Sequence, residues 1–391
     1  MRITLVTRIF APEPSAASQR LQSLVDALVS RGGHVTVLTS TVPRALTGAD
    51  ADSTAFRVRR FPVLRDRAGY VRGYLQYMSF DIPAFFRALF SRRADVIVVE
   101  PPPTTGAVVR LASAIRRTPY VYYAADVWSL ASASTGAPRP VLRLVKAIET
   151  FALRGAARVI AVSDGVAAEV RRLAPRADVT VVGHGVDERV FRPDVVPDEP
   201  ELDAVYVGTA SEWHGAGVFV DALRTLAGRG LRPRVAFVGQ GGEWRALRES
   251  VRAAGLEETV SFSGPVDAHR AAGRLRGARV ALASMRMGIG YDFAIPTKMY
   301  SAIAVGTPVL VAAPESLRTL VNREQLGWGC SFDVGEVAEA LAAAVAQPPS
   351  SERRAALAAW AATNVGASAV AARAADVVAK SARSGSLIGT R

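Results

Sequence analysis

The chain has 391 residues, half of them apolar, and a formal net charge of +13. This length and apolar content exclude a disordered chain and allow two domains, each with its own core. The apolar runs are short and broken by Arg, Gly or Pro, so we expect no transmembrane helix. The single cysteine, Cys330, excludes an internal disulfide framework and a multi-cysteine metal site. The chain opens on a strand-like segment rather than a signal-peptide pattern, which favours a cytoplasmic protein.

The positive charge is unevenly distributed. Residues 1–187 contain 25 basic and 14 acidic residues, whereas residues 188–391 contain 23 and 21. This asymmetry predicts that the first half meets an anionic surface or substrate. The chain has no zinc-finger spacing, basic zipper or RNP-like motif, so we expect no nucleic acid partner. A phospholipid surface or a phosphorylated acceptor fits the excess of positive charge better. The alternative is that the charge reflects an arginine-rich composition without function.

Strand-like runs alternate with helical patterns throughout the first half. We expect strands at 3–7, 34–39, 96–99, 120–123, 158–162 and 179–182. Helical patterns lie between them at 18–30, 104–116, 141–154 and 165–173. Near-continuous apolar strands that alternate with helices indicate a parallel, doubly wound sheet.

The same alternation of strand-like runs and helical patterns recurs in the second half. We expect strands at 204–207, 234–238, 260–262, 279–283 and 308–311, with helices at 216–227, 243–253, 267–275 and 297–304. The predicted fold class is therefore α/β, with two Rossmann-like doubly wound parallel-sheet domains facing a cleft. We assign the parts as 1–187 for the first domain, 188–203 for a linker, 204–365 for the second domain, and 366–391 for a C-terminal helix that packs back on the first domain and ends in a frayed tail.

Loops after parallel strands carry the ligand-binding residues of such folds. In the first half these loops hold Arg8, a plausible anion contact, and Glu13. The loop after strand 120–123 holds Asp126, which could act as a base or bind sugar hydroxyls, and Trp128, which could stack on a sugar. The alternatives are a tight turn in the first loop, and a capping Asp with a packed Trp in the second.

The most aromatic stretch of the chain is residues 70–90, which arginines flank. It could lie in a membrane interface with its basic residues on lipid headgroups. We favour packing into the core.

In the second half, Gly208 ends a strand and His214 precedes a helix, a possible phosphate cradle. Gly239 and Gly241 also follow a strand and open a helix. A single pair of glycines is weak evidence, and these two do not form a complete dinucleotide-binding fingerprint.

Lys298 lies in the first turn of the helix 297–304, where the helix dipole disfavours a cation. It is one of only three lysines in the chain, beside Lys146 and Lys380. An anion at this helix start would offset the unfavourable position. Arg286 lies just upstream and could join Lys298 on one diphosphate. Solvated side chains are the alternative for both residues.

These motifs together resemble the GT-B glycosyltransferases, in particular the retaining glycosyltransferase family 4. The resemblance covers nearly the whole chain and rests on the start of the chain and on the segments 31–39, 162–165, 183–193, 237–241, 262–266 and 296–308. It implies a nucleotide diphosphate-sugar bound mainly by the second domain and an acceptor on the first. It also implies that basic side chains and helix dipoles, without a bound metal, hold the diphosphate.

The chain departs from this family pattern at several positions. Ser301 replaces a Glu that usually holds the nucleotide ribose, and the usual acid near Phe293 is missing, although Asp292 is adjacent. Thr209 and His214 replace an Arg and a Lys. The interdomain turn has His184 in place of Asn, and the first loop has Ser15-Ala-Ala in place of glycines.

The sequence thus predicts a metal-independent, retaining glycosyltransferase for a glycan or lipid-linked acceptor in cell-envelope biosynthesis, cytoplasmic or peripheral on the inner face of the membrane. It leaves the donor open between UDP- and GDP-sugars. The proposed catalytic residues are Asp126, Arg286 and Lys298. The proposed donor-binding residues are Gly208, His214, Gly239, Gly241, Thr297, Lys298 and Ser301, and the acceptor-side residues are Arg8, Glu13 and Trp128. A non-catalytic nucleotide-binding scaffold and a sugar-nucleotide epimerase are the alternatives.

Overall fold

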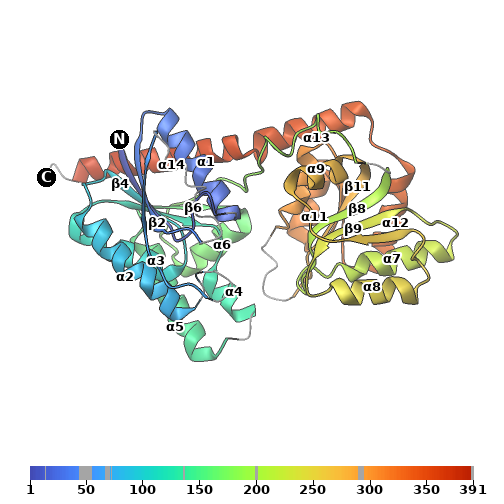
Figure 1. The fold of residues 1–391 in the computed structure, drawn as a ribbon, viewed down its shortest axis with the longest axis horizontal. Helices are drawn as coiled ribbons and strands as arrows, with labels where there is room; N and C mark the ends of the chain where they lie inside the picture. The colour runs from blue at the N-terminus through green and yellow to red at the C-terminus, as the bar shows by residue number, and fades with distance from the viewer. Residues whose placement is uncertain are drawn as a thin grey trace. The chain divides into compact units, whose positions relative to one another are not determined.

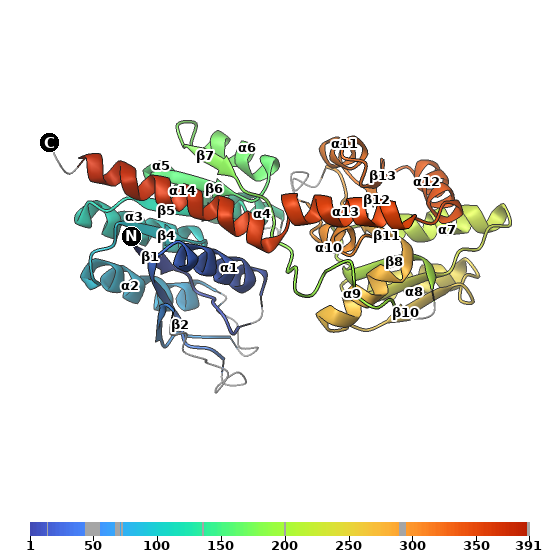
Figure 2. The ribbon, with the colours of Figure 1, turned by 90° about the horizontal axis from the view of Figure 1, so that it is seen from above.

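A computed structural model describes residues 1–13, 15–43, 55–66, 71, 73–134, 137–198, 201–288 and 295–388. The chain divides into two compact units (Figures 1 and 2). Unit 1 consists of Met1–Gly185 together with Ala367–Arg391, and unit 2 is Val186–Gly366.

Unit 1 is built on a seven-stranded parallel sheet in the order β3-β2-β1-β4-β5-β6-β7. The strands are β1 (Arg2–Val6), β2 (His34–Ser40), β3 (Arg57–Phe61), β4 (Val96–Val99), β5 (Tyr120–Ala124), β6 (Arg158–Ala161) and β7 (Val179–Val181). Strands β4 and β5 are buried along their whole length, because helices cover both faces of a parallel sheet.

The helices of unit 1 form a layer on each face of this sheet. They are α1 (Ala16–Ser30), α2 (Tyr74–Phe90), α3 (Pro103–Arg116), α4 (Trp128–Ser134), α5 (Arg139–Gly155), α6 (Asp164–Leu173) and α14 (Ala367–Ile388). Helices α1 and α14 lie side by side on one face, and α2, α3 and α5 cover the other (Figure 1). The side chain of Ser15 accepts a hydrogen bond from the N–H of Ser18 and so begins α1.

Unit 2 contains a six-stranded parallel sheet in the order β10-β9-β8-β11-β12-β13. Its strands are β8 (Leu202–Thr209), β9 (Val235–Gln240), β10 (Val260–Ser263), β11 (Ala278–Ser284), β12 (Val309–Ala312) and β13 (Gly327–Cys330). Its helices are α7 (Gly217–Gly228), α8 (Trp244–Ala253), α9 (Ala268–Arg276), α10 (Lys298–Ala304), α11 (Glu315–Arg323), α12 (Val334–Ala346) and α13 (Ser351–Asn364). Successive residues of β8 enter two different apolar clusters, because the side chains of a strand alternate between the faces of its sheet.

The predicted α/β class with two doubly wound parallel sheets is confirmed. Two edge strands were missed. β3 carries three arginines and is only partly buried, so it lacks the apolar run that marks a buried strand. β13 alternates glycine with Trp328 and Cys330, and glycine is rare inside strands. The other strands differ from their predicted ranges by at most two residues, and so do helices α1, α3, α5, α6, α7, α8, α9 and α10. No helix was predicted at α4 or α11.

The segment predicted as a linker, 188–203, differs from what the structure describes. It belongs to unit 2, and β8 already begins at Leu202. Three apolar side chains of the segment pack against the core of unit 2, those of Val190, Phe191 and Val195. This packing removes apolar surface from water, which an exposed linker would not do.

Candidate functional site

The carboxyl ends of β8 and β9 approach each other through glycines. Gly208 pairs with Gly239, and both have positive φ angles, of 117° and 143°. A Cβ atom on Gly239 would lie 2.2 Å from the carbonyl oxygen of Gly208, and one on Gly241 would lie 2.0 Å from that of Ala210. Only glycine allows the two loops to come this close.

Lys298 reaches this edge of the sheet from the start of α10. Its Nζ donates to the hydroxyl of Tyr206 at 2.5 Å and to the carbonyl oxygen of Thr209 at 2.8 Å. The ammonium lies 3.8 Å from the centre of the Tyr206 ring, and its stem lies against Gly208. Burial lowers the pKa of Lys298 to about 7, so this lysine changes charge near neutral pH.

His214 lies in the loop after β8. Its Nδ1 accepts a hydrogen bond of 3.1 Å from the N–H of Ser211, which assigns the ring proton of the neutral form to Nε2. Burial, and then the positive charge of Lys298, lower the pKa of His214 to about 4. The ring is therefore neutral at pH 7 and presents one N–H donor.

Arg286 lies just after β11 and connects it to the loop before α7. Its guanidinium pairs with Glu243 at 3.2 Å, and the other carboxylate oxygen of Glu243 accepts the N–H of Ala216 at 3.2 Å. The Arg286 stem lies against Gly215, where a Cβ atom would come within 2.6 Å of it. Half of the Arg286 side chain is exposed, so the guanidinium also faces solvent.

The predicted phosphate contacts of the second half include the start of α10. α10 has seven residues, and the N–H groups of Met299, Tyr300 and Ser301 already donate to the carbonyl oxygens of Pro296 and Thr297. These three amides are occupied because the first turn closes on itself. Thr297 is exposed and Ser301 is half-buried. Asp292 and Phe293 lie outside the described residues.

In unit 1, Arg8 follows β1 and is buried. Its Nη1 donates to the carbonyl oxygen of Val71 at 3.0 Å, and its guanidinium lies 4.3 Å from the ring centre of Tyr77 and 5.8 Å from that of Trp128. Burial lowers the pKa of Arg8, while Tyr77 and Asp81 oppose this effect. The arrangement brings Arg8 and Trp128 together, as two of the three predicted acceptor-side residues.

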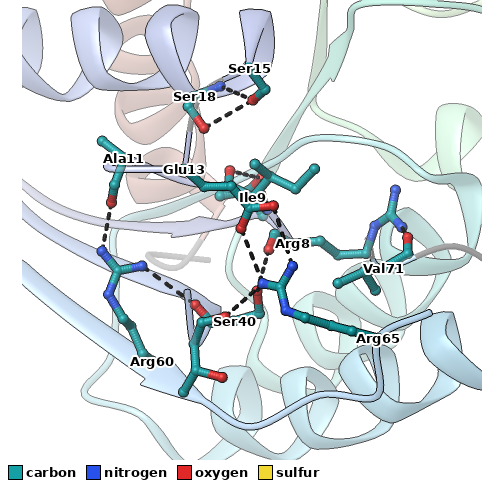
Figure 3. A network of polar contacts seen from close by, with 12 residues as sticks. Arg8, Ile9, Ala11, Glu13, Ser15, Ser18, Ser40, Arg60, Arg65 and Val71 are labelled. Atoms are coloured by element: carbon teal, nitrogen blue, oxygen red, sulfur yellow. Dashed lines mark hydrogen bonds and ion pairs between the residues drawn. The ribbon is translucent and has the colours of Figure 1, made fainter. Parts of the chain in front are cut away.

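The third, Glu13, lies in the loop after β1. It forms an ion pair with Arg65 at 3.1 Å and is 8% exposed. Arg65 also donates to the hydroxyl of Ser40, which in turn donates to the carbonyl oxygen of Arg8 (Figure 3). This network holds the loop after β1 at two points, because Ser40 contacts the Arg8 carbonyl oxygen and Arg65 contacts the Glu13 side chain.

Asp126 and Trp128 lie at the carboxyl end of β5. One Asp126 oxygen accepts the N–H of Val127 at 2.8 Å. The buried carboxylate of Glu149 on α5 accepts the N–H groups of Trp128 and Ser129 at 2.8 and 2.9 Å. Burial raises the pKa of Glu149 and these hydrogen bonds oppose it. Glu149 therefore positions the segment that carries Trp128.

Sequence reasoning missed the residues that hold these groups in place. Tyr206 and Glu243 contact Lys298 and Arg286, and Glu149 contacts the backbone of Trp128. Tyr206 lies inside an apolar strand, where a tyrosine is typical of the core. The sequence did contain a signal for the other two residues. Glu243 follows the glycines after β9, and Glu149 lies inside a basic amphipathic helix. An acid at such a place needs a partner when it is buried.

The described residues contain no group of three His, Cys, Asp or Glu side chains that could hold a metal ion. Within the same residues, no helix is both long and apolar enough to cross a bilayer.

Comparisons with known proteins match both halves of the chain. Residues 15–185 match the family model "Glycosyl transferase 4-like domain", and residues 201–347 match "Glycosyl transferases group 1". The chain belongs to the GT-B glycosyltransferases of group 1. The resemblance found in its sequence is thereby confirmed.

Relatives of this chain include the Escherichia coli (strain K12) protein named "Putative colanic acid biosynthesis glycosyltransferase WcaL". The two are 30% identical over 174 residues, which are 44% of this chain and 43% of WcaL. The chain thus matches less than half of the length of that curated relative.

Two solved structures share the GT-B fold over almost the whole chain. Sucrose-phosphate synthase from Thermosynechococcus elongatus has 17% identity and a TM-score of 0.70, covering 97% of this chain and 98% of its own. HepE from Anabaena, solved in complex with UDP, has 18% identity and a TM-score of 0.70, covering 97% and 100%. At these identities the likeness supports the fold.

Proposed function

We propose that the chain transfers a sugar from a nucleoside diphosphate-sugar to a hydroxyl group of a glycan or lipid-linked acceptor. The observation that carries this proposal is Lys298 beside His214 and the glycines at the carboxyl edge of the unit 2 sheet. Two cationic side chains, Lys298 and Arg286, and one neutral N–H donor are suited to a diphosphate. HepE, bound to UDP in its structure, supports this donor class.

In the proposed reaction the bond between the anomeric carbon and the phosphate oxygen breaks. The acceptor oxygen forms the new bond to that carbon, the acceptor proton is released, and the nucleoside diphosphate leaves. Negative charge grows on the leaving diphosphate, so Lys298 and Arg286 would stabilise the transition state more than the bound donor. Asp126 would orient the sugar or the acceptor.

Three further parts of the proposal rest on the family. Transfer is retaining, no metal ion is required, and the product belongs to a cell-envelope polysaccharide or glycoconjugate, as the name of WcaL suggests. The proposed location is the cytoplasm, with peripheral contact of unit 1 to the inner face of the membrane. Proton NMR of the first product would test retention, and turnover in excess EDTA would test the absence of a metal requirement.

The donor class can be tested before an acceptor is known. Titration calorimetry with UDP and GDP should show binding of one nucleotide, and Lys298→Ala should weaken it at least tenfold, because a charge-assisted hydrogen bond contributes about 1.5–3 kcal/mol. Lys380→Ala, on α14 of unit 1, is the matched control and should bind as the wild type does. A Lys298→Ala protein with wild-type affinity and turnover would contradict the proposal.

The same samples separate the alternatives. Release of sugar only in the presence of an acceptor pool supports transfer. Nucleotide binding without release from any donor would instead indicate a non-catalytic scaffold. Conversion of the donor sugar without any acceptor would indicate an epimerase.

A further inference from the structure

Large exposed apolar side chains gather on three neighbouring helices of unit 1. Helices α2, α3 and α5 lie next to one another over one face of the sheet (Figure 1). Their exposed apolar residues are Tyr74, Leu75, Ile82, Phe86, Phe90, Leu111, Ile115, Val141, Leu144 and Phe151. We call this surface the α2–α3–α5 face.

The spacing of these residues places them on the outer side of each helix. On α2, Ile82, Phe86 and Phe90 are four residues apart and form one stripe, whereas Phe80 and Ala84 are buried beneath. The rings of Phe86 and Phe90 stack at 6.4 Å, and Phe90 is 78% exposed. The aromatic stretch that we expected to pack into the core is therefore divided between core and surface. Its first residue, Tyr70, lies outside the described residues.

Two arginines of α3 connect its stripe to the other two. Arg116 donates to the carbonyl oxygens of Leu89 and Ser91 at the end of α2. Arg110 donates to the carbonyl oxygen of Phe151 on α5 and lies 4.0 Å from the centre of its ring. The apolar stripes are thus neighbours, and contiguous apolar surface of this kind marks an interaction site.

The charged groups exposed on these helices are all basic. The acids of the three helices, Asp81 and Glu149, are 0% and 1% exposed. A hollow of about 550 Å³ beside Phe151 is lined by Arg110, Arg143, Lys146 and Arg154, together with Ala147 and Thr150. Exposed apolar side chains next to a purely cationic hollow suit an anionic amphiphile.

We propose that the α2–α3–α5 face binds the surface of a bilayer that contains anionic phospholipids. Phe86, Phe90 and Leu144 would enter the headgroup region, and the basic residues of the hollow would contact lipid phosphates. A second copy of the chain fits less well, because pairing the same face would bring basic side chains against each other. This inference extends the membrane contact proposed above, but it does not depend on the identity of the donor.

Vesicle flotation tests the proposal with the full chain. Wild-type protein should float with phosphatidylcholine vesicles that contain 30% phosphatidylglycerol more tightly than with pure phosphatidylcholine, by on the order of a hundredfold or more, and high salt should weaken this binding. The variant R143Q/K146Q/R154Q should bind on the order of a hundredfold more weakly, since each basic residue near an anionic surface contributes about 1 kcal/mol. The variant F86S/F90S/L144S should also lose binding, with its salt dependence retained.

The control variant R224Q/R245Q/R252Q removes the same charge from exposed helix positions of unit 2 and should bind as the wild type does. Equal binding to both vesicle types, or equal loss in the control, would overturn the proposal. A dimer that the F86S/F90S/L144S variant abolishes, without any change in vesicle binding, would assign the face to self-association and equally overturn it. None of these results depends on nucleotide binding or sugar transfer, so failure here leaves the proposed function intact.

Discussion

Lys298 combines burial with two hydrogen-bond acceptors and an aromatic ring. Burial disfavours its charged form, whereas the Tyr206 hydroxyl, the Thr209 carbonyl and the ring face all favour it. Burial dominates, because the pKa falls from 10.5 to about 7. An ammonium has three N–H groups and two are already used. The third is available to a phosphate oxygen.

We predict that nucleoside diphosphate binding weakens as the pH rises above about 7. The cation predominates below its pKa and is lost above it, so the dissociation constant should stay flat below pH 6.5. It should then rise by up to about tenfold per pH unit above 7, until the pKa of the bound state is passed. Titration calorimetry at pH 6, 7, 8 and 9 measures this. A dissociation constant independent of pH across the range would show that the charge of Lys298 is not needed.

Tyr206→Phe should shift this profile towards lower pH. The substitution keeps the ring but removes the hydroxyl that accepts from Lys298, so the cation loses one partner and its pKa falls further. A shift of about one pH unit corresponds to a hydrogen bond worth about 1.4 kcal/mol. A merely structural tyrosine would lower the melting temperature and leave the midpoint of the pH profile unchanged.

His214 should not contribute to the pH dependence of nucleotide binding. Its pKa of about 4 keeps it neutral between pH 6 and 9, so it acts as a fixed N–H donor through Nε2. We predict that His214→Ala weakens nucleotide binding about three- to tenfold, by loss of a neutral hydrogen bond, at every pH in this range. The same calorimetric series measures it, and a loss confined to one side of pH 7 would argue against the neutral donor.

At the scale of elements, the close approach of the loops after β8 and β9 is specific to glycine. We predict that Gly241→Ala lowers the free energy of unfolding by about 2–4 kcal/mol, because its Cβ would lie 2.0 Å from a backbone oxygen and the residue has a φ of 148°. Urea unfolding measures the difference. Gly255→Ala is the control, since it has a φ of 63° but nothing within 4 Å of its added Cβ. Equal losses would assign the effect to φ alone.

The sequence predicted helices and strands far better than it predicted contacts between side chains. Apolar strands such as β4 and β5 were found because both faces of a parallel sheet are buried, while the arginine-rich β3 and the glycine-rich β13 lack that pattern. Lys298 could be identified because lysine is rare in this chain and this one lies at a helix start, and Gly208 because it ends a strand. In the structure the Lys298 stem lies against Gly208. The partners of Lys298 and Arg286, Tyr206 and Glu243, are 92 and 43 residues away in sequence, so no local pattern could identify them.

At the scale of the whole molecule, unit 1 depends on the last helix of the chain. Helix α14 lies against α1 and against β4, β5 and β6. Its Arg373 donates to the carbonyl oxygen of Val182 at 2.8 Å, and its Asp376 pairs with Arg31 at 2.8 Å. The apolar side of α14 is buried, including Val378 at 0% exposure. Residues that follow unit 2 in sequence therefore complete the core of unit 1.

Val378→Asp should consequently destabilise unit 1 and leave unit 2 intact. An unpaired carboxylate in this apolar layer costs about 3 kcal/mol or more, whereas Lys380→Asp, at an exposed position of the same helix, should cost less than about 1 kcal/mol. Four of the five tryptophans lie in unit 2, so a Trp128→Phe background makes tryptophan fluorescence a reporter of that unit. In urea, Val378→Asp should lower the midpoint measured by circular dichroism without moving the fluorescence midpoint. A common shift of both midpoints would mean that the two units unfold as one, and the stability of the donor-binding unit would then depend on the same helix.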